Sequence, residues 1–266
     1  MEHYKVCMTI AGSDPSGGAG IQADIKTFTL LGCYAQAVPT SLTVQNTERV
    51  VRQVALDGQL VSEQLDTVMR DWRPDAVKIG ITPHADTIAA IAGNLRKYRP
   101  GFVVLDPVVV STSGHRLIDD QGIEALQEQL IPLCTLITPN IPEARLLAGL
   151  SDAVPTSDLA HRLYARYAPT AVLVKGGHAT GAPEDILCSG NGLTTFCAER
   201  INTTNTHGTG CVLSSAIASY AARGFSLEQA VSKAKQFLTD ALRKGADYST
   251  GHGHGPLYLI GQTRNA

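Results

Sequence analysis

The sequence predicts an α/β protein, a three-layer α/β/α sandwich around a central, mostly parallel sheet. Short apolar runs alternate with helical patterns along the whole chain, which is the order of elements that builds such a sheet. Polar residues directly follow several of these runs, as ligand contacts do at the carboxyl ends of parallel strands. A glycine-rich turn joins the first run to the first helical pattern, as in nucleotide- and phosphate-binding folds. We find no repeat or linker, so residues 1–266 are expected to form one domain.

Strands that are buried on both faces of a parallel sheet are apolar throughout, and runs of this kind occur at regular intervals. They predict strands at residues 5–11, 34–44, 76–80, 102–105, 134–138 and 171–175. Residues 52–56 indicate a short strand or flap. Residues 185–188 and 193–197 indicate a hairpin around the turn Ser189-Gly190-Asn191-Gly192.

Helices are expected where apolar residues recur with a period near 3.6, as Leu65, Val68, Met69 and Trp72 do. The segments are 21–31, 61–72, 85–98, 119–129, one starting at 142, 157–167, one following Cys211, and 227–244. Asp119 or Asp120 is the expected N-cap of its helix, and residues 111–114 are expected to form a loop.

Composition limits the class of function. The chain has 266 residues, 44% hydrophobic and 17% charged, with a net charge of −2 and no basic block, so neither a nucleic-acid nor an acidic-lipid surface is expected. The apolar stretch 101–110 is too short to span a bilayer. Six scattered cysteines and no export pattern indicate reduced thiols in a cytoplasmic protein.

The segment Asn205-Thr206-His207-Gly208-Thr209-Gly210-Cys211 precedes an apolar helical run. Glycines leave backbone amides open to a ligand, and a helix that begins here directs its positive dipole end to the same place. Such a site stabilises phosphate, and the dipole favours a Cys211 thiolate. This segment alone equally fits a glycine-rich loop that enters a buried helix, with Cys211 as a small core residue.

Other polar residues stand at the ends of predicted strands: Gln45, Asp106, Asn140 and Lys175. Because the ends of parallel strands share one edge, we expect them to meet the glycine loop in one crevice. Gln45 suits the edge of a heterocycle, since it offers a donor and an acceptor. A cation, carboxylates and an anion hole together favour phosphoryl transfer with magnesium.

Several residues also have ordinary structural explanations. Asp24 and Glu143, each in the first turns of a helix, could simply complement the helix dipole. His207 is expected to be a hydrogen-bonding loop residue. His252 and His254 are too few to hold a metal, so a flexible loop is expected there.

Together these motifs resemble the bacterial hydroxymethylpyrimidine/phosphomethylpyrimidine kinases of the ribokinase-like superfamily. The matching stretches span nearly the whole chain in the order of that family. They are Thr9 to Asp24, Gln45-Asn46-Thr47, Lys78-Ile79-Gly80, Asp106-Pro107-Val108, Thr138-Pro139-Asn140, Lys175-Gly176-Gly177-His178 and Asn205 to Cys211. One departure is Ile81, where family members usually have methionine, which changes the pocket shape but not the chemistry.

The resemblance implies two ATP-dependent steps, phosphorylation of 4-amino-5-hydroxymethyl-2-methylpyrimidine and then of its monophosphate, in thiamin biosynthesis. It implies that Cys211 takes the proton of the alcohol while the amides of Gly208 to Cys211, including Gly210, hold the transferred phosphoryl. The other implied roles fall into three groups. They are pyrimidine binding by Gln45, Asp24, Gly12 and the backbone at Val108; nucleotide binding by Lys175, Asn140, Thr206 and Thr209; and magnesium organisation by Asp106 and Glu143.

A homodimer is usual for the resembled family. Two other functions fit part of the pattern. Pyridoxal kinases share the Gly-Thr-Gly-Cys loop, although they often lack the Gln-Asn pair at 45 and 46. A ligand-binding or regulatory protein on the same scaffold is the second alternative, against which Lys175, Asp106 and Cys211 argue.

Overall fold

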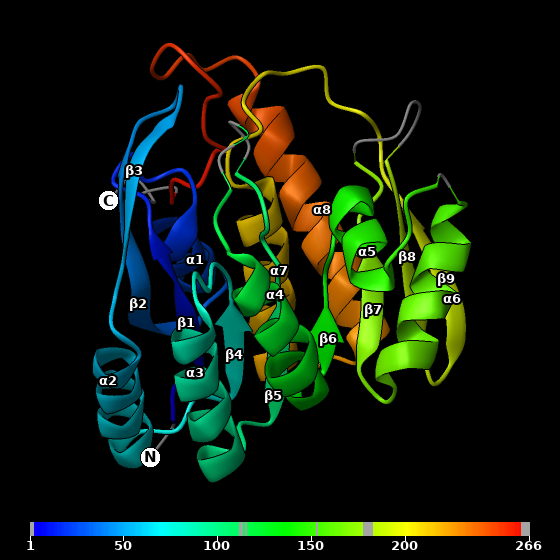
Figure 1. The fold of residues 1–266 in the computed structure, drawn as a ribbon. Coiled ribbons are helices and arrows are strands. Elements are labelled where there is room, and N and C mark those ends of the chain that lie inside the picture. The colour runs from blue at the N-terminus through cyan, green and yellow to red at the C-terminus, as the bar shows by residue number, and fades with distance from the viewer. Residues whose placement is uncertain (1–2, 112–113, 115, 153, 178–182, 262–266) are drawn as a thin grey trace.

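The computed structural model describes residues 3–111, 114, 116–152, 154–177 and 183–261. One nine-stranded sheet runs through it in the order β3-β2-β1-β4-β5-β6-β7-β8-β9 (Figure 1). The six central strands, β2, β1, β4, β5, β6 and β7 in sheet order, are parallel to one another. At the two edges the pairs β2–β3, β7–β8 and β8–β9 are antiparallel. The strands are β1 Val6–Ser13, β2 Tyr34–Gln45, β3 Val50–Ala55, β4 Ala76–Ile79, β5 Phe102–Leu105, β6 Leu136–Ile137, β7 Ala171–Val174, β8 Glu184–Ser189 and β9 Gly192–Cys197.

Helices cover both faces of the sheet, which confirms the predicted three-layer sandwich (Figure 1). One face carries α2 Gly58–Asp71, α3 Ala85–Tyr98, α4 Asp120–Ala125, α5 Ile141–Ala148 and α6 Thr156–Tyr167. The other face carries α1 Gly20–Leu30, α7 Thr209–Ala222 and α8 Leu227–Gly245. A wider π-helical turn, Leu126–Leu130, and a 3₁₀ turn, Ile131–Leu133, extend α4. Among the described residues, none of the helices is long and apolar enough to cross a membrane.

Each face has its own hydrophobic core. Met8, Ile10 and Ile79 point to the α2–α6 side, while Cys7, Ala76 and Val104 point to the α1/α7/α8 side. This division follows from the two-residue period of the strands, which sends neighbouring side chains to opposite faces. α7 is buried along most of its length and lies on β1, β4 and β5. Its amino-terminal end therefore reaches the carboxyl edge of the central strands.

Strand β1 extends beyond the apolar residues that predict it and ends at Ser13. Gly12 and Ser13, expected in the loop, pair with Ser41 and Leu42 of β2 after a register shift. Asp119 is the N-cap of α4 and accepts a hydrogen bond from the Gly122 amide at 2.6 Å. Thr112 and Ser113 of the expected loop lie outside the described residues.

The segment 251–256, expected to be a flexible loop, packs instead between two parts of the carboxyl edge. Gly253 N–H donates to Thr47 Oγ1 at 3.2 Å, and His254 N–H donates to the Thr47 carbonyl at 3.0 Å. On the other side, His207 N–H donates to the Gly255 carbonyl at 3.1 Å. A Cβ at Gly251 or Gly253 would overlap Thr47, so glycine allows this close packing. Among the described residues no group of three or more metal-type ligands occurs.

Candidate active site

The glycine loop ends in a helix N-terminus, as the sequence predicts. Gly208 is the N-cap of α7 and has φ of +84°, and a Cβ at this position would overlap the Gly18 carbonyl oxygen. Only glycine fits both requirements. The two glycine-rich segments therefore touch, although 190 residues separate them. Amides in the first turn of a helix lack intrahelical acceptors, so this end of α7 can bind an anion.

Lys175 and Asp106 lie directly beside this turn. Lys175 Nζ is 2.5 Å from Asp106 Oδ1, and Thr138 Oγ1 lies 3.2 Å from the same oxygen. A Cβ at Gly210 would stand 3.0 Å from Asp106 Oδ2 and 3.3 Å from Lys175 Nζ. The loop that carries Cys211, the lysine and the carboxylate thus meet at one rim of the sheet.

Glu143 completes the charged group from the start of α5. Its carboxylate accepts a hydrogen bond from Asn140 N–H at 2.8 Å, while Asn140 Oδ1 accepts one from Glu143 N–H at 2.9 Å. This capping box occupies the Asn140 oxygen, so only its Nδ2 is available to a nucleotide. Burial raises the pKa of Glu143 to about 7, an effect that Lys175 opposes and Asp106 reinforces.

A single lysine balances two buried carboxylates here, which fits a site that takes up a cation. Asp106 and Glu143 are 1% and 6% exposed. Magnesium usually binds proteins through one or two carboxylates and keeps waters or phosphates as its other ligands. The described residues hold no larger cluster of metal ligands, and this arrangement does not require one.

Cys211 lies in the first turn of α7, but its thiol is not preactivated. Burial raises the pKa of Cys211 to about 11, although Lys78 and the Gly20 N–H lower it. Contrary to the expectation that the helix end favours a thiolate, desolvation outweighs the dipole at this position. Asp24 and Asp106 add to the upward shift.

Asp24 also differs from expectation. It has no exposed surface, and its carboxylate is paired with Lys78 Nζ at 2.8 Å, with Thr9 Oγ1 at 2.6 Å and with Ser215 Oγ at 2.7 Å. Asp24 therefore lies beneath the glycine loops rather than in their mouth, and a direct contact with a ligand is excluded in this conformation. Ser215 follows Cys211 by one helical turn, so the network supports the α7 face that carries the thiol.

Gln45 lies at the end of β2, as predicted, beside the glycine loop. Its amide is 3.4 Å from His207 Nε2, which is 2.8 Å from Asp14 Oδ2. Burial would raise the pKa of Asp14, but hydrogen bonds from His207 and Ser16 lower it to about 2. His207 is thus the hydrogen-bonding loop residue that the sequence suggested.

The remaining candidates are buried or half-buried. Gly12 is buried, and a Cβ there would lie 2.8 Å from Ser41 Oγ and 3.2 Å from Ile81 Cδ1. Val108 is half-buried, and its N–H donates to the Asp106 carbonyl at 2.8 Å. Thr206 and Thr209 are half-buried within the loop itself. His178 lies outside the described residues.

Several buried charged residues were not assigned roles from the sequence, among them Lys78 and Asp185. Lys78 has no exposed surface and Asp185 is 5% exposed. Asp185 pairs with Lys235 Nζ at 2.6 Å and accepts a hydrogen bond from Gly176 N–H at 3.0 Å, which braces the turn after Lys175. The signal for Lys78 was a charged residue inside an otherwise apolar strand, which requires a buried partner.

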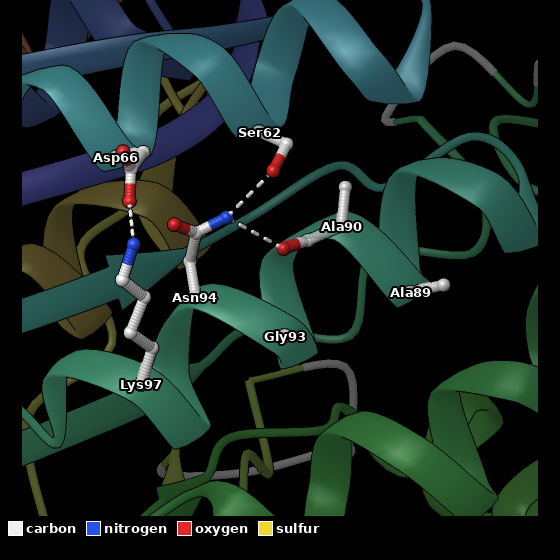
Figure 2. Close-up of a pocket in the computed structure, with 7 residues that line it drawn as sticks. All are labelled: Ser62, Asp66, Ala89, Ala90, Gly93, Asn94 and Lys97. Carbon is white, nitrogen blue, oxygen red and sulfur yellow. Dashed lines mark hydrogen bonds and ion pairs between the residues drawn. The ribbon is translucent and has the colours of Figure 1, made fainter.

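A hollow of about 300 Å³ between α2 and α3 lies away from these residues (Figure 2). Its polar groups pair with one another: Asn94 Nδ2 donates to Ser62 Oγ and to the Ala90 carbonyl, both at 3.0 Å, and Lys97 pairs with Asp66. Figure 2 shows that the contacts of Asn94 with Ser62 and of Lys97 with Asp66 join the two helices, whereas the Asn94–Ala90 contact lies within α3. The hollow therefore presents no group prepared for chemistry.

Known proteins resemble this chain over most of its length. The model of a family described as phosphomethylpyrimidine kinase matches residues 14–258. The hydroxymethylpyrimidine/phosphomethylpyrimidine kinase of Rhizobium meliloti is 44% identical over 256 residues, which cover 95% of this chain and 96% of that protein. The thiamine biosynthesis bifunctional protein ThiED of Geobacter sulfurreducens is 47% identical over 95% of this chain, which spans only 52% of that longer protein.

Two solved structures share the fold. The phosphomethylpyrimidine kinase of Clostridium difficile has 40% identity and a TM-score of 0.78, covering 89% of this chain and 98% of that one. The pyridoxal kinase of Bacillus subtilis, solved as an ADP complex, has 32% identity and a TM-score of 0.87, covering 96% and 97%.

Proposed function

Because the chain belongs to the phosphomethylpyrimidine kinase family, with its ribokinase-like fold, we propose that it phosphorylates 4-amino-5-hydroxymethyl-2-methylpyrimidine and then its monophosphate, with ATP as donor. This places it in thiamin biosynthesis. The observation that carries the proposal is the meeting of Lys175, Asp106 and the Gly208–Cys211 turn at one edge.

The phosphate end of the site supplies positive charge where the transferred group passes. Amides of the α7 turn and the Lys175 ammonium lie beside each other, and both stabilise the negative oxygens of a phosphoryl group. Burial lowers the pKa of Lys175, but the negative charges of Asp106 and Glu143 raise it by more. The net shift is upward, so the amine stays charged. Thr206, Thr209 and Asn140 would contact the nucleotide.

Magnesium fits next to this lysine. Asp106 and Glu143 would hold the ion, directly or through its waters. When bound, magnesium neutralises the charge of the ATP phosphates. Lys175, which pairs with Asp106, would contact the nucleotide phosphates.

The pyrimidine end holds the acceptor. Gln45 would offer a donor and an acceptor to the aminopyrimidine edge, with Gly12 nearby and the backbone at Val108 closing the pocket. Cys211 would act as the base of the first step: its thiolate, formed by loss of the thiol proton, accepts the proton of the alcohol. In the second step the acceptor is an anionic phosphate oxygen, which needs no base.

A homodimer and a cytoplasmic location complete the proposal, since both are usual for the resembled family. Light scattering of the purified protein measures the first: a mass near twice that of the 28.2 kDa chain is expected. A monomer at all working concentrations would contradict this part alone.

Mass spectrometry of reactions with ATP, magnesium and the pyrimidine alcohol tests the function directly. We expect the monophosphate to appear first and the diphosphate later. Pyridoxal in a parallel reaction tests the closest alternative, which the fold of the Bacillus subtilis pyridoxal kinase suggests. A higher kcat/KM on pyridoxal would replace the proposed substrate. Nucleotide binding without turnover of either substrate would favour a regulatory protein.

A further inference from the structure

Gln45 lies between two polar partners that decide which way its amide faces. Thr43 and Gln45 share one face of β2, since they are two residues apart. One terminal atom of the amide lies 3.1 Å from Thr43 Oγ1, and the other lies 3.4 Å from His207 Nε2. The oxygen and nitrogen of an amide are told apart only by such contacts.

His207 Nε2 must be a donor. It lies 2.8 Å from Asp14 Oδ2. Asp14 is ionised, can only accept, and already receives hydrogen bonds from Ser16 N–H, Ser16 O–H and Ala19 N–H. Gly18 packs against the imidazole so closely that a Cβ there would overlap it, which holds the ring in place. The nitrogen that faces Gln45 therefore carries a hydrogen.

Thr43, in contrast, must present lone pairs to Gln45. Its oxygen lies 2.9 Å from the Ser13 carbonyl, a group that can only accept. The single hydroxyl hydrogen of Thr43 therefore points to Ser13, the nearer of its two neighbours. In the structure the amide oxygen of Gln45 faces Thr43 and the amide nitrogen faces His207. That arrangement sets acceptor against acceptor and donor against donor. Exchange of the two atoms sets the amide nitrogen against the Thr43 lone pairs and the amide oxygen 3.4 Å from His207 Nε2, whose single hydrogen Asp14 and Gln45 then share.

We propose that Thr43 and the His207–Asp14 pair are positioning residues that fix the Gln45 amide with its nitrogen toward Thr43 and its oxygen toward His207. They thereby determine which order of donor and acceptor a substrate ring must present. This proposal rests on the proposed function, because it concerns how that substrate is read.

The fixed amide has one hydrogen and one lone pair left for a ligand. An aminopyrimidine presents a ring nitrogen, which accepts, beside an exocyclic amine, which donates. It matches the amide in one orientation only, with the amine on the His207 side. The 4-oxo analogue, 5-hydroxymethyl-2-methylpyrimidin-4-one, presents a carbonyl and a ring N–H, the same pair in reversed order. A free amide would rotate by 180° to accept the analogue, whereas a fixed amide rejects it.

The test compares kcat/KM for the 4-amino substrate and the 4-oxo analogue in two variants at one position. Thr43→Val removes the hydroxyl at nearly constant volume, and Thr43→Ser retains it as the matched control. The unsubstituted protein is expected to prefer the amine by about 10³-fold or more, since mispaired buried polar groups discriminate strongly. Thr43→Val is expected to reduce this ratio about tenfold, chiefly through KM, and Thr43→Ser to keep it.

His207→Phe gives an independent measurement, because it keeps a ring packed on Gly18 but removes the Nε2–H donor. It is expected to reduce the ratio in the same direction. Thermal melting of each variant identifies losses that are due to unfolding. An unchanged ratio in folded Thr43→Val and His207→Phe, or an equal loss in Thr43→Ser, would overturn the proposal alone. No turnover of the amine by the unsubstituted protein would overturn it together with the proposed function.

Discussion

Loss of the Lys78 charge is expected to destabilise the protein strongly. Lys78 and Asp24 are both fully buried, with 2.8 Å between Nζ and Oδ2. Lys78→Met keeps much of the volume but leaves the Asp24 carboxylate with only the hydroxyls of Thr9 and Ser215 as partners. Breaking a buried pair on one side costs about 3–5 kcal/mol, which is a large part of the roughly 5–15 kcal/mol that stabilises a typical domain.

The double variant Lys78→Met/Asp24→Asn separates this cost from simple loss of packing. Both charges are then absent. The amide oxygen accepts a hydrogen bond from one of the two hydroxyls, and the amide nitrogen, in place of the other carboxylate oxygen, donates to the second. Replacing both members of a buried pair is often nearly neutral, so the double variant should lie within about 1–2 kcal/mol of the parent protein. The double variant should therefore recover about 2–3 kcal/mol of the cost of Lys78→Met, and the single variant Asp24→Asn completes the cycle that gives the coupling energy.

Urea unfolding followed by circular dichroism measures these differences. The matched control is Lys5→Met, which breaks an exposed pair with Asp75 at 3.0 Å, where the lysine side chain is 52% exposed. That change should cost about 0–1 kcal/mol. The reasoning is refuted if Lys78→Met costs no more than Lys5→Met, or if the double variant shows no recovery. A raised KM for the pyrimidine with unchanged stability in Asp24→Asn would instead return Asp24 to direct ligand contact.

Other predictions concern the glycine loop and its neighbours. Cys211→Ala should lower the first phosphorylation by about 10²–10⁴-fold and the second by less than about tenfold in separate single-step assays; equal losses would indicate a structural role. Because the pKa of the Cys211 thiol is about 11, the first-step rate should rise from pH 7 to pH 10 while the second stays level, and parallel profiles would contradict a base. Gly208→Ala should lower the free energy of unfolding by about 2 kcal/mol or more, since its φ of +84° and the Gly18 carbonyl both exclude a Cβ; an unchanged urea midpoint would count against this. The lowered pKa of Asp14, about 2 against 3.8, contributes about 1–2 kcal/mol that is present above pH 4 and lost as the pH falls toward 2. Asp14→Asn should remove that part of the acid dependence, and a parent-like curve in this variant would assign it elsewhere.

The fold followed closely from local patterns, because alternating buried strands and amphipathic helices leave few alternatives. Gln45, Asp106 and Lys175 were found because a polar residue at the end of an apolar run is visible in the sequence. Asp24 was misplaced, because an acid near the start of a helix looks the same in the sequence whether it faces a ligand or a buried lysine 54 positions away. The thiol of Cys211 was misjudged for a similar reason. A helix end can be located from sequence, but the desolvation that opposes it depends on the packed neighbours.

The segment 251–256 joins the hairpin end at Thr47 to the loop at His207 by backbone hydrogen bonds on both sides. This one segment near the carboxyl end of the chain therefore connects the region of Gln45, the proposed pyrimidine-binding residue, to the loop that carries the proposed phosphate-binding turn. An affinity tag or fusion partner inserted within 251–256 would disturb both at once. The same addition after residue 261 would leave the hydrogen bonds of this segment to Thr47 and His207 intact.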